Sequence, residues 1–219
     1  MDSDDPYAIP DTKTLLRAGG LEILNEEGQK VPFNSLLTPS PHKPTQQRQQ
    51  IHLIIFIRHF FCGHCEAYIR TISANLPLSL LSTASPPINL SIIGCGQPST
   101  VPEYKARTSC PYPIYCDPER NLYRLLGMRC TLDLGKKKPE YIKSGLLAGS
   151  MSSMWTMLRS RNIWKGGAFE QNGGEWIFVD GEVRWCHRMR STRDHAEVWE
   201  VRKALGLEVK EGEVKRDDE

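Results

Sequence analysis

An apolar run over residues 51–57, IHLIIFI, constrains the fold of this 219-residue chain more than any other feature. The run is nearly continuous and β-branched, which is typical of a strand that is covered on both faces of a parallel or mixed sheet. Two cysteines in C-x-x-C spacing, Cys62 and Cys65, follow it almost at once. Apolar residues then recur at helical spacing over residues 66–76, and Pro77 ends the predicted helix. The sequence therefore predicts a cysteine pair at a strand-to-helix junction.

A second strand and helix, predicted over residues 88–93 and 99–108, complete a β-α-β-α pattern with an expected right-handed crossover. We therefore expect an α/β fold with a central mixed β-sheet flanked by helices. Further expected elements are a short strand at 21–24, a strand at 113–115, a helix from Asp117-Pro118 to 126, a helical insertion at 144–164, a hairpin of 176–179 with 183–186, and a helix at 194–205.

The expected domain organisation is one domain over residues 18–209. Residues 1–17 are polar and are predicted to be a flexible N-terminus, and residues 210–219 form a charged C-terminal tail. The length suits a single domain with decorations.

Composition and charge limit which partners the protein can bind and in which cellular compartment it is expected. A net charge of +2 gives no electrostatic footprint for nucleic acid. The run at 51–57 is too short to span a bilayer, which needs about 20 apolar residues, and the acidic N-terminus has no apolar signal region. We therefore expect a cytoplasmic protein without a membrane span. Seven cysteines, an odd number, are expected to be mostly free thiols, so the close pair needs its own explanation.

The start of a helix favours a thiolate, because unpaired amides and the helix dipole stabilise negative charge there. Arg58, His59 and His64 are expected to add positive charge near the pair. The main alternative interpretation of the pair is half of a zinc site. Such a site needs a second pair of ligands, and among the other cysteines only the spacing Cys110-x5-Cys116 could supply one. Inert buried thiols are the third reading. Redox chemistry is favoured, with no metal and no cofactor beyond the thiols, since no glycine-rich phosphate loop is present.

Four segments carry a resemblance to a known family: IIFIRHFFCGHCEAYI, YPIYCDPERNLYRLLGM, YIKSGLLAGSMSSMW and GGAFEQNGGEWIFVDGEVRWCHRMRSTRDHAEV. Together they resemble the peroxiredoxin-like AhpC/TSA antioxidant-enzyme-domain proteins of the thioredoxin superfamily, particularly the fungal branch. The resemblance implies a thioredoxin-like fold over most of the chain.

The resemblance leaves the attacking sulfur open. By comparison with peroxiredoxins, Cys65 takes the position of the peroxide-attacking cysteine and Cys62 that of a threonine. By comparison with thioredoxins, Cys62 attacks and Cys65 resolves. The resemblance also offers Arg184, Arg188 or Arg190, by position, as an arginine that holds the thiolate, with Arg188 the one chosen, and Pro113 as a cis-proline facing the motif. The missing threonine and the missing upstream proline set this chain apart from efficient peroxidases.

We expect a thiol-dependent oxidoreductase that uses the cysteine pair on a peroxide, endoperoxide or disulfide substrate. A cellular thiol such as thioredoxin or glutathione would then reduce the Cys62–Cys65 disulfide. A homodimer is the oligomeric state that we consider for this protein. The alternative is a non-redox thioredoxin-fold protein, acting as a natural-product biosynthesis enzyme or as a binding scaffold.

Overall fold

The apolar run forms β3 (Ile51–Phe56), which lies inside one mixed sheet. The structure is a computed structural model that describes residues 5–37, 49–136, 139–142 and 165–209. In these ranges seven strands pair in the order β2-β1-β5-β4-β3-β6-β7. The other six strands are β1 (Glu22–Leu24), β2 (Lys30–Pro32), β4 (Ile88–Gly94), β5 (Ile114–Cys116), β6 (Gly174–Val179) and β7 (Glu182–Arg188).

Strand direction divides the sheet in two. β3, β4 and β5 run parallel, whereas β6 pairs antiparallel with β3 and β7 antiparallel with β6. The register pairs Phe56 at the end of β3 with Gly174 at the start of β6. The end of β3 and the segment before β6 therefore meet at one edge of the sheet.

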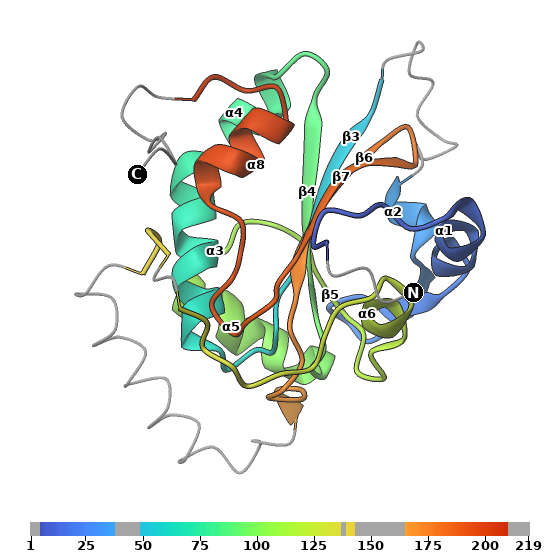
Figure 1. Ribbon diagram of the computed structural model, residues 1–219, viewed down its shortest axis with the longest axis vertical. Coiled ribbons are helices and arrows are strands. Elements are labelled where there is room, and N and C mark those ends of the chain that lie inside the picture. Colours follow the sequence, from blue (N-terminus) through green and yellow to red (C-terminus); the bar gives the residue numbers. More distant parts are fainter. Residues whose placement is uncertain (1–4, 38–48, 137–138, 143–164, 210–219) are drawn as a thin grey trace.

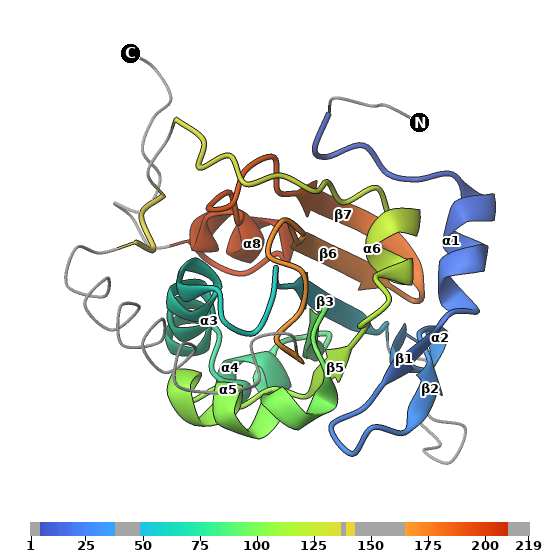
Figure 2. The same ribbon diagram turned by 90° about the horizontal axis from the view of Figure 1, so that it is seen from below.

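Helices cover both faces of the sheet (Figures 1 and 2). One face carries α3 (Gly63–Asn75), α4 (Leu78–Thr83), α5 (Val101–Thr108) and α8 (Val198–Ala204). The other carries α1 (Thr12–Gly19), α2 (Asn34–Leu37) and α6 (Asn121–Leu125). A 3-10 turn, Pro98–Thr100, precedes α5.

Side-chain alternation along β3 builds a separate core on each face. Leu53 and Ile55 belong to the core under α3, and Ile54 and Phe56 belong to the core under α1 and α6. All four side chains are fully buried. This two-sided burial explains why the run is almost continuously apolar, and it confirms the predicted α/β sheet with flanking helices.

Two terminal elements differ from expectation. α1 lies partly within the stretch that was predicted to be flexible: Asp11 caps it by accepting a 2.7 Å hydrogen bond from the Thr14 amide. The last helix begins at Val198 rather than at 194, because Glu197 and Glu200 form its capping box. The predicted helical insertion at 144–164 and the charged tail at 210–219 lie outside the described residues.

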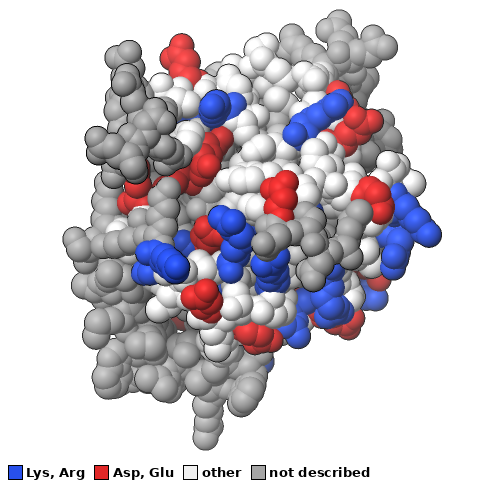
Figure 3. Space-filling view, in the orientation of Figure 1, with Lys and Arg blue, Asp and Glu red and all other residues white. Residues whose placement is uncertain are grey.

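Charges are mixed on the face seen in Figure 3, where lysines and arginines are interspersed with acidic residues. This pattern fits the small net charge of +2. Within the described ranges, no helix has both the length and the apolar character that crossing a membrane requires.

Candidate active site

The cysteine pair lies where β3 ends and α3 begins. Cys62 is the N-cap residue of α3, with extended backbone angles (φ −79°, ψ 106°), and its Sγ accepts a hydrogen bond from the Cys65 amide at 3.3 Å. A sulfur thus takes the role that a serine or aspartate oxygen usually has at a helix start. The free amides and the helix dipole at this position stabilise a negative charge on Cys62.

A buried arginine adds to this stabilisation. Arg58 Nη1 lies 3.5 Å from Cys62 Sγ. Burial alone would raise the pKa of Cys62, but the hydrogen bonds from Cys65 and the charge of Arg58 outweigh it. The pKa of Cys62 is therefore well below its usual value, and Cys62 is the more acidic thiol of the pair.

The backbone holds Arg58 in place. Its Nη2 donates to the Phe169 carbonyl, and its own carbonyl accepts a 2.8 Å hydrogen bond from the Cys95 thiol. The side chain is only 6% exposed. In the part of the chain that the structure describes, no carboxylate forms an ion pair with this guanidinium, so its charge is directed to Cys62.

The two neighbouring histidines lie at the site, but they do not supply a fixed charge. Burial lowers the pKa of His59 to about 4, and its Nδ1 accepts a hydrogen bond from the Phe61 amide at 3.3 Å. Burial also lowers the pKa of His64, which is half-buried. Arg58 is therefore the permanent cation that the sequence analysis sought among these three residues.

Cys65 is the opposite of Cys62. Its Sγ is fully buried, accepts a hydrogen bond from the Arg58 amide at 3.4 Å and lies 3.4 Å from His195 Nε2. Burial, followed by the hydrogen bond and the charge of Cys62, raises the pKa of Cys65 well above its usual value. Cys65 is therefore a protonated thiol beside a histidine.

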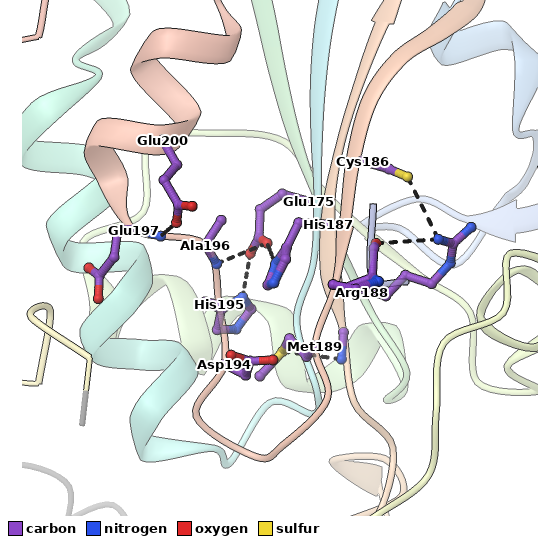
Figure 4. A network of polar contacts seen from close by, with 12 residues as sticks. Glu175, Cys186, His187, Arg188, Met189, Asp194, His195, Ala196, Glu197 and Glu200 are labelled. Carbon is purple, nitrogen blue, oxygen red and sulfur yellow. Dashed lines mark hydrogen bonds and ion pairs between the residues drawn. The ribbon is translucent and has the colours of Figure 1, made fainter. Parts of the chain in front are cut away.

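A polar network that the sequence did not predict lies behind Cys65 (Figure 4). His195 Nδ1 lies 2.5 Å from one oxygen of Glu175, and the other oxygen lies 2.9 Å from His187 Nδ1. The Ala196 amide donates to that second oxygen at 3.1 Å. Glu175 and His187 come from adjacent strands, and the only sequence signal was the presence of histidines near the end of a family-like segment.

Arg188 does not join the cysteine pair. It lies on the other face of β7 together with Cys186, whereas His187 points toward Glu175 (Figure 4). Its guanidinium donates to the carbonyl oxygens of Leu126 (2.7 Å) and Ala8 (2.6 Å), and it stacks over Trp176. Arg188 thus ties the N-terminal segment to the sheet.

Pro113 is also remote from the pair. It precedes β5, at the opposite end of the parallel strands from the carboxyl end of β3, where the cysteines lie. The cis peptide bond in the described residues joins Ser85 and Pro86, so the expected cis bond before Pro113 is not there. The residue that packs against the end of β3 is Gly173, directly before β6: a Cβ added to it would come within 1.8 Å of the Phe56 carbonyl oxygen.

The other thiols are separate from the pair. All seven cysteines are free, and Cys130 alone among them is exposed. Burial raises the pKa of Cys110 to about 11 and raises that of Cys116 further. Neither of them forms a disulfide with Cys62 or Cys65 in this structure. In the described ranges, no group of three or more histidine, cysteine or acidic residues is arranged to hold a metal ion.

Comparisons with known proteins agree with this architecture. A family profile described as "AhpC/TSA antioxidant enzyme" matches residues 46–191. Peroxiredoxin-like 2C of Homo sapiens is 30% identical over 203 residues, covering 91% of this chain and 84% of that protein. The protein of the same name from Mus musculus is 29% identical over 190 residues, covering 86% of this chain and 78% of that protein.

A solved structure shows the same fold. The bacterioferritin comigratory protein of Xanthomonas campestris, in a study of its alkyl peroxide reduction activity, superimposes with a TM-score of 0.51 and 10% identity. The match covers 87% of this chain and 89% of that one. It confirms the thioredoxin-like fold that the resemblance implied.

Proposed function

Because this chain belongs to the AhpC/TSA antioxidant enzyme family, we propose that it is a thiol-dependent reductase whose redox centre is the Cys62–Cys65 pair. Cys62 is the attacking sulfur and Cys65 the resolving sulfur. The substrate carries a reducible O–O or S–S bond, as in a hydroperoxide, an endoperoxide or a disulfide.

The observation that carries this proposal is the different surroundings of two sulfurs three positions apart. Cys62 has the features of a nucleophile: a helix start, an amide donor and a guanidinium at 3.5 Å. Both sulfurs are buried, but Cys65 has the features of a resolving thiol, since it lies beside a histidine rather than a guanidinium and its pKa is raised. This order of attack is that of thioredoxins rather than that of peroxiredoxins.

With a hydroperoxide, the Cys62 thiolate attacks the distal oxygen, the O–O bond breaks, and the alkoxide leaves as an alcohol after taking a proton. Cys62 becomes a sulfenic acid. Cys65 then attacks the Cys62 sulfur, releasing water and forming the Cys62–Cys65 disulfide. With a disulfide substrate, Cys62 forms a mixed disulfide and Cys65 displaces the second thiol.

The cycle closes when an external dithiol, or two monothiols, reduce the Cys62–Cys65 disulfide and are themselves oxidised to a disulfide. A thioredoxin-type protein or glutathione has the required chemistry. The cytoplasm is the compartment that keeps such donors reduced.

Steady-state reduction of cumene hydroperoxide and of glutathione disulfide, with dithiothreitol as the reductant, tests this function. The wild type should turn over at least one of them. Cys62→Ser should abolish turnover, and Cys65→Ser should lower it strongly, whereas Cys110→Ser, a matched buried cysteine, should retain it. Full activity in both Cys62→Ser and Cys65→Ser would contradict the proposal and favour a non-redox scaffold or biosynthetic role.

A further inference from the structure

His195 is in contact with the buried sulfur of the pair. Its Nε2 atom lies 3.4 Å from Cys65 Sγ, and His195 and Cys65 are 3% and 0% exposed. Bulk water therefore has almost no access to this thiol, and a proton that leaves Cys65 must first pass to a group that touches it.

The hydrogen bond on the far side of the ring determines the tautomer of His195. Glu175 Oε1, 2.5 Å from Nδ1, belongs to a carboxylate, which can only accept a hydrogen bond. The proton of the neutral imidazole is thus on Nδ1. Nε2 then carries the lone pair, directed at Cys65. The arrangement of thiol, imidazole and carboxylate matches the nucleophile, base and orienting group of a catalytic triad.

Glu175 remains ionised although it is fully buried. Burial alone would raise its pKa, but the hydrogen bonds from His187 and His195 outweigh this and hold it below its usual value. Burial tends to lower the pKa of His187, but Glu175 outweighs this and raises it. The buried carboxylate therefore has a second hydrogen-bond partner in His187, on the side away from Cys65.

Aromatic residues fix the plane of the His195 ring. Tyr68 on α3 stacks on it with a centroid distance of 4.2 Å and an interplanar angle of 6°. The Tyr141 hydroxyl accepts a hydrogen bond from the His195 amide at 3.2 Å. This fixed orientation keeps Nε2 directed at Cys65 Sγ, and proton transfer requires such a short, aligned contact.

Resting on the proposed function, we propose that His195 is a catalytic residue of the second half-reaction: it takes the proton from Cys65 as that sulfur attacks Cys62. The S–S bond forms between Cys65 and Cys62, and the bond from Cys62 to the substrate-derived group breaks. The proton held on Nε2 then passes to that leaving group, hydroxide or thiolate. When an external thiol later reduces the disulfide, the same proton transfer runs in reverse.

The first half-reaction does not need this base. While Cys62 is a thiolate, its negative charge opposes ionisation of the neighbouring Cys65 thiol, which therefore keeps its proton. Once Cys62 is bonded to oxygen or to a second sulfur, it is no longer a thiolate and is a poor acceptor. His195 Nε2 is then the acceptor that remains in contact with Cys65 within the described part of the chain.

Single-turnover reaction with the chromogenic disulfide dithiobis(nitrobenzoate) separates the two steps. Attack by Cys62 releases one thionitrobenzoate, and resolution by Cys65 releases the second. A Cys130→Ser background removes the exposed cysteine that would otherwise react. Both phases are followed by absorbance in stopped flow, and mass spectrometry identifies the adduct on Cys62.

In His195→Gln the first phase should stay within about twofold of the wild type, and the second should slow by about 10²-fold, the usual contribution of a general base. Glu175→Gln keeps the side-chain shape, but its amide donates to Nδ1 and moves the proton to Nε2, so the second phase should again slow. His52→Gln is the matched control, since His52 is equally buried on β3 but bonds to Leu36 and Ser91. It should leave both phases unchanged.

The pH dependence separates proton transfer from mere misplacement of Cys65. The titratable groups around His195 are Cys65 and Tyr68 of α3, Tyr141, Glu175 and His187. The pKa of each tyrosine is raised, chiefly by burial, so Cys65 is the one whose ionisation limits the variant. The slow phase of His195→Gln should accelerate about tenfold per pH unit, because without the base Cys65 must lose its proton before it attacks, and it should approach the wild-type rate once the thiol is ionised. A displaced Cys65 would stay slower than the wild type even when it is ionised.

The outcomes are distinct. No first phase in the wild type would refute the proposed function itself. A normal first phase, with a second phase that neither His195→Gln nor Glu175→Gln slows, would leave that function intact and overturn the role of His195.

Discussion

At the scale of single residues, the site depends on what each sulfur touches. Cys62 receives an amide and a guanidinium, whereas Cys65 receives an amide and an imidazole. The first turn of α3 thus lowers the pKa of Cys62 at its start, whereas the pKa of Cys65, three residues later, is raised. Desolvation acts on both sulfurs, so hydrogen bonds and nearby charge make the difference.

The guanidinium of Arg58 gives a first prediction. Arg58→Met removes the permanent cation beside Cys62, so the pKa of Cys62 should rise and its reaction with peroxide near neutral pH should slow, roughly tenfold. Thiolate absorbance against pH and the peroxide rate measure the two effects. Arg184→Met is the control, because that arginine pairs with Glu182 on the exposed side of β7. An unchanged titration in Arg58→Met would show that the helix start alone holds the thiolate.

The lowered pKa of Cys62 gives a second prediction. An ordinary thiol with a pKa of about 8.5 loses about 50-fold in alkylation rate between about pH 8.5 and 6.5, because its thiolate fraction falls. Cys62 should lose less than about threefold over this range, since it stays ionised below the usual pKa. Iodoacetamide labelling of the Cys62 peptide, with exposed Cys130 in the same sample as the internal reference, measures both rates.

At the scale of elements, α3 and α5 are joined by a buried ion pair near the cysteines. Glu66 on α3 is fully buried and lies 3.0 Å from Arg107 Nε on α5. Arg107 Nη2 also donates to the Phe60 carbonyl at 2.7 Å, which holds the chain just before Cys62. The pair thus fixes the turn from β3 into α3.

Removal of this carboxylate gives a third prediction. Glu66→Ala leaves Arg107 without its buried partner and should lower the free energy of unfolding by about 3 kcal/mol, as loss of one member of a buried pair usually does. Glu103→Gln removes the exposed partner of the same arginine and should cost less than about 1 kcal/mol. Urea unfolding of both variants makes the comparison, and equal losses would rule out the buried pair as the dominant contact.

The sequence predicted those parts of the site that are local in the chain. The strand, the cysteine pair, the helix and Arg58 lie within one stretch, so periodicity and spacing were enough. His195 is 130 residues from Cys65, and Glu175 meets it only through the pairing of β6 with β3. Spacing carries no information on that register, which is also why Arg188 and Pro113 were placed at the site by position alone.

At the scale of the whole molecule, buried histidines couple folding to pH. His52 on β3 bonds through Nδ1 to the Leu36 carbonyl at 2.6 Å and through Nε2 to Ser91 on β4 at 3.0 Å. Burial lowers the pKa of His52 to about 4, although the bond to Leu36 opposes this. His59 at the site also has a pKa of about 4, again because of burial.

These histidines give a fourth prediction. Their folded pKa lies below the unfolded value of about 6.5, so the unfolded state binds more protons in acid and stability falls as the pH drops from 6.5 toward 4. His52 alone should lose on the order of 2 kcal/mol between about pH 7 and 5. Urea unfolding of the wild type and of His52→Gln at both pH values should show a smaller loss in the variant. Ser91→Ala, which keeps the titrating ring, should retain the slope.

The central claim is that Cys62 attacks and Cys65 resolves. The most direct measurement is mass spectrometry of Cys65→Ser and Cys62→Ser after one equivalent of hydrogen peroxide with dimedone present, which traps sulfenic acid. The account predicts a dimedone adduct on Cys62 in Cys65→Ser, no adduct on Cys65 in Cys62→Ser, and a Cys62–Cys65 disulfide in the wild type. An adduct on Cys65 alone, or two unreacted thiols, would contradict it.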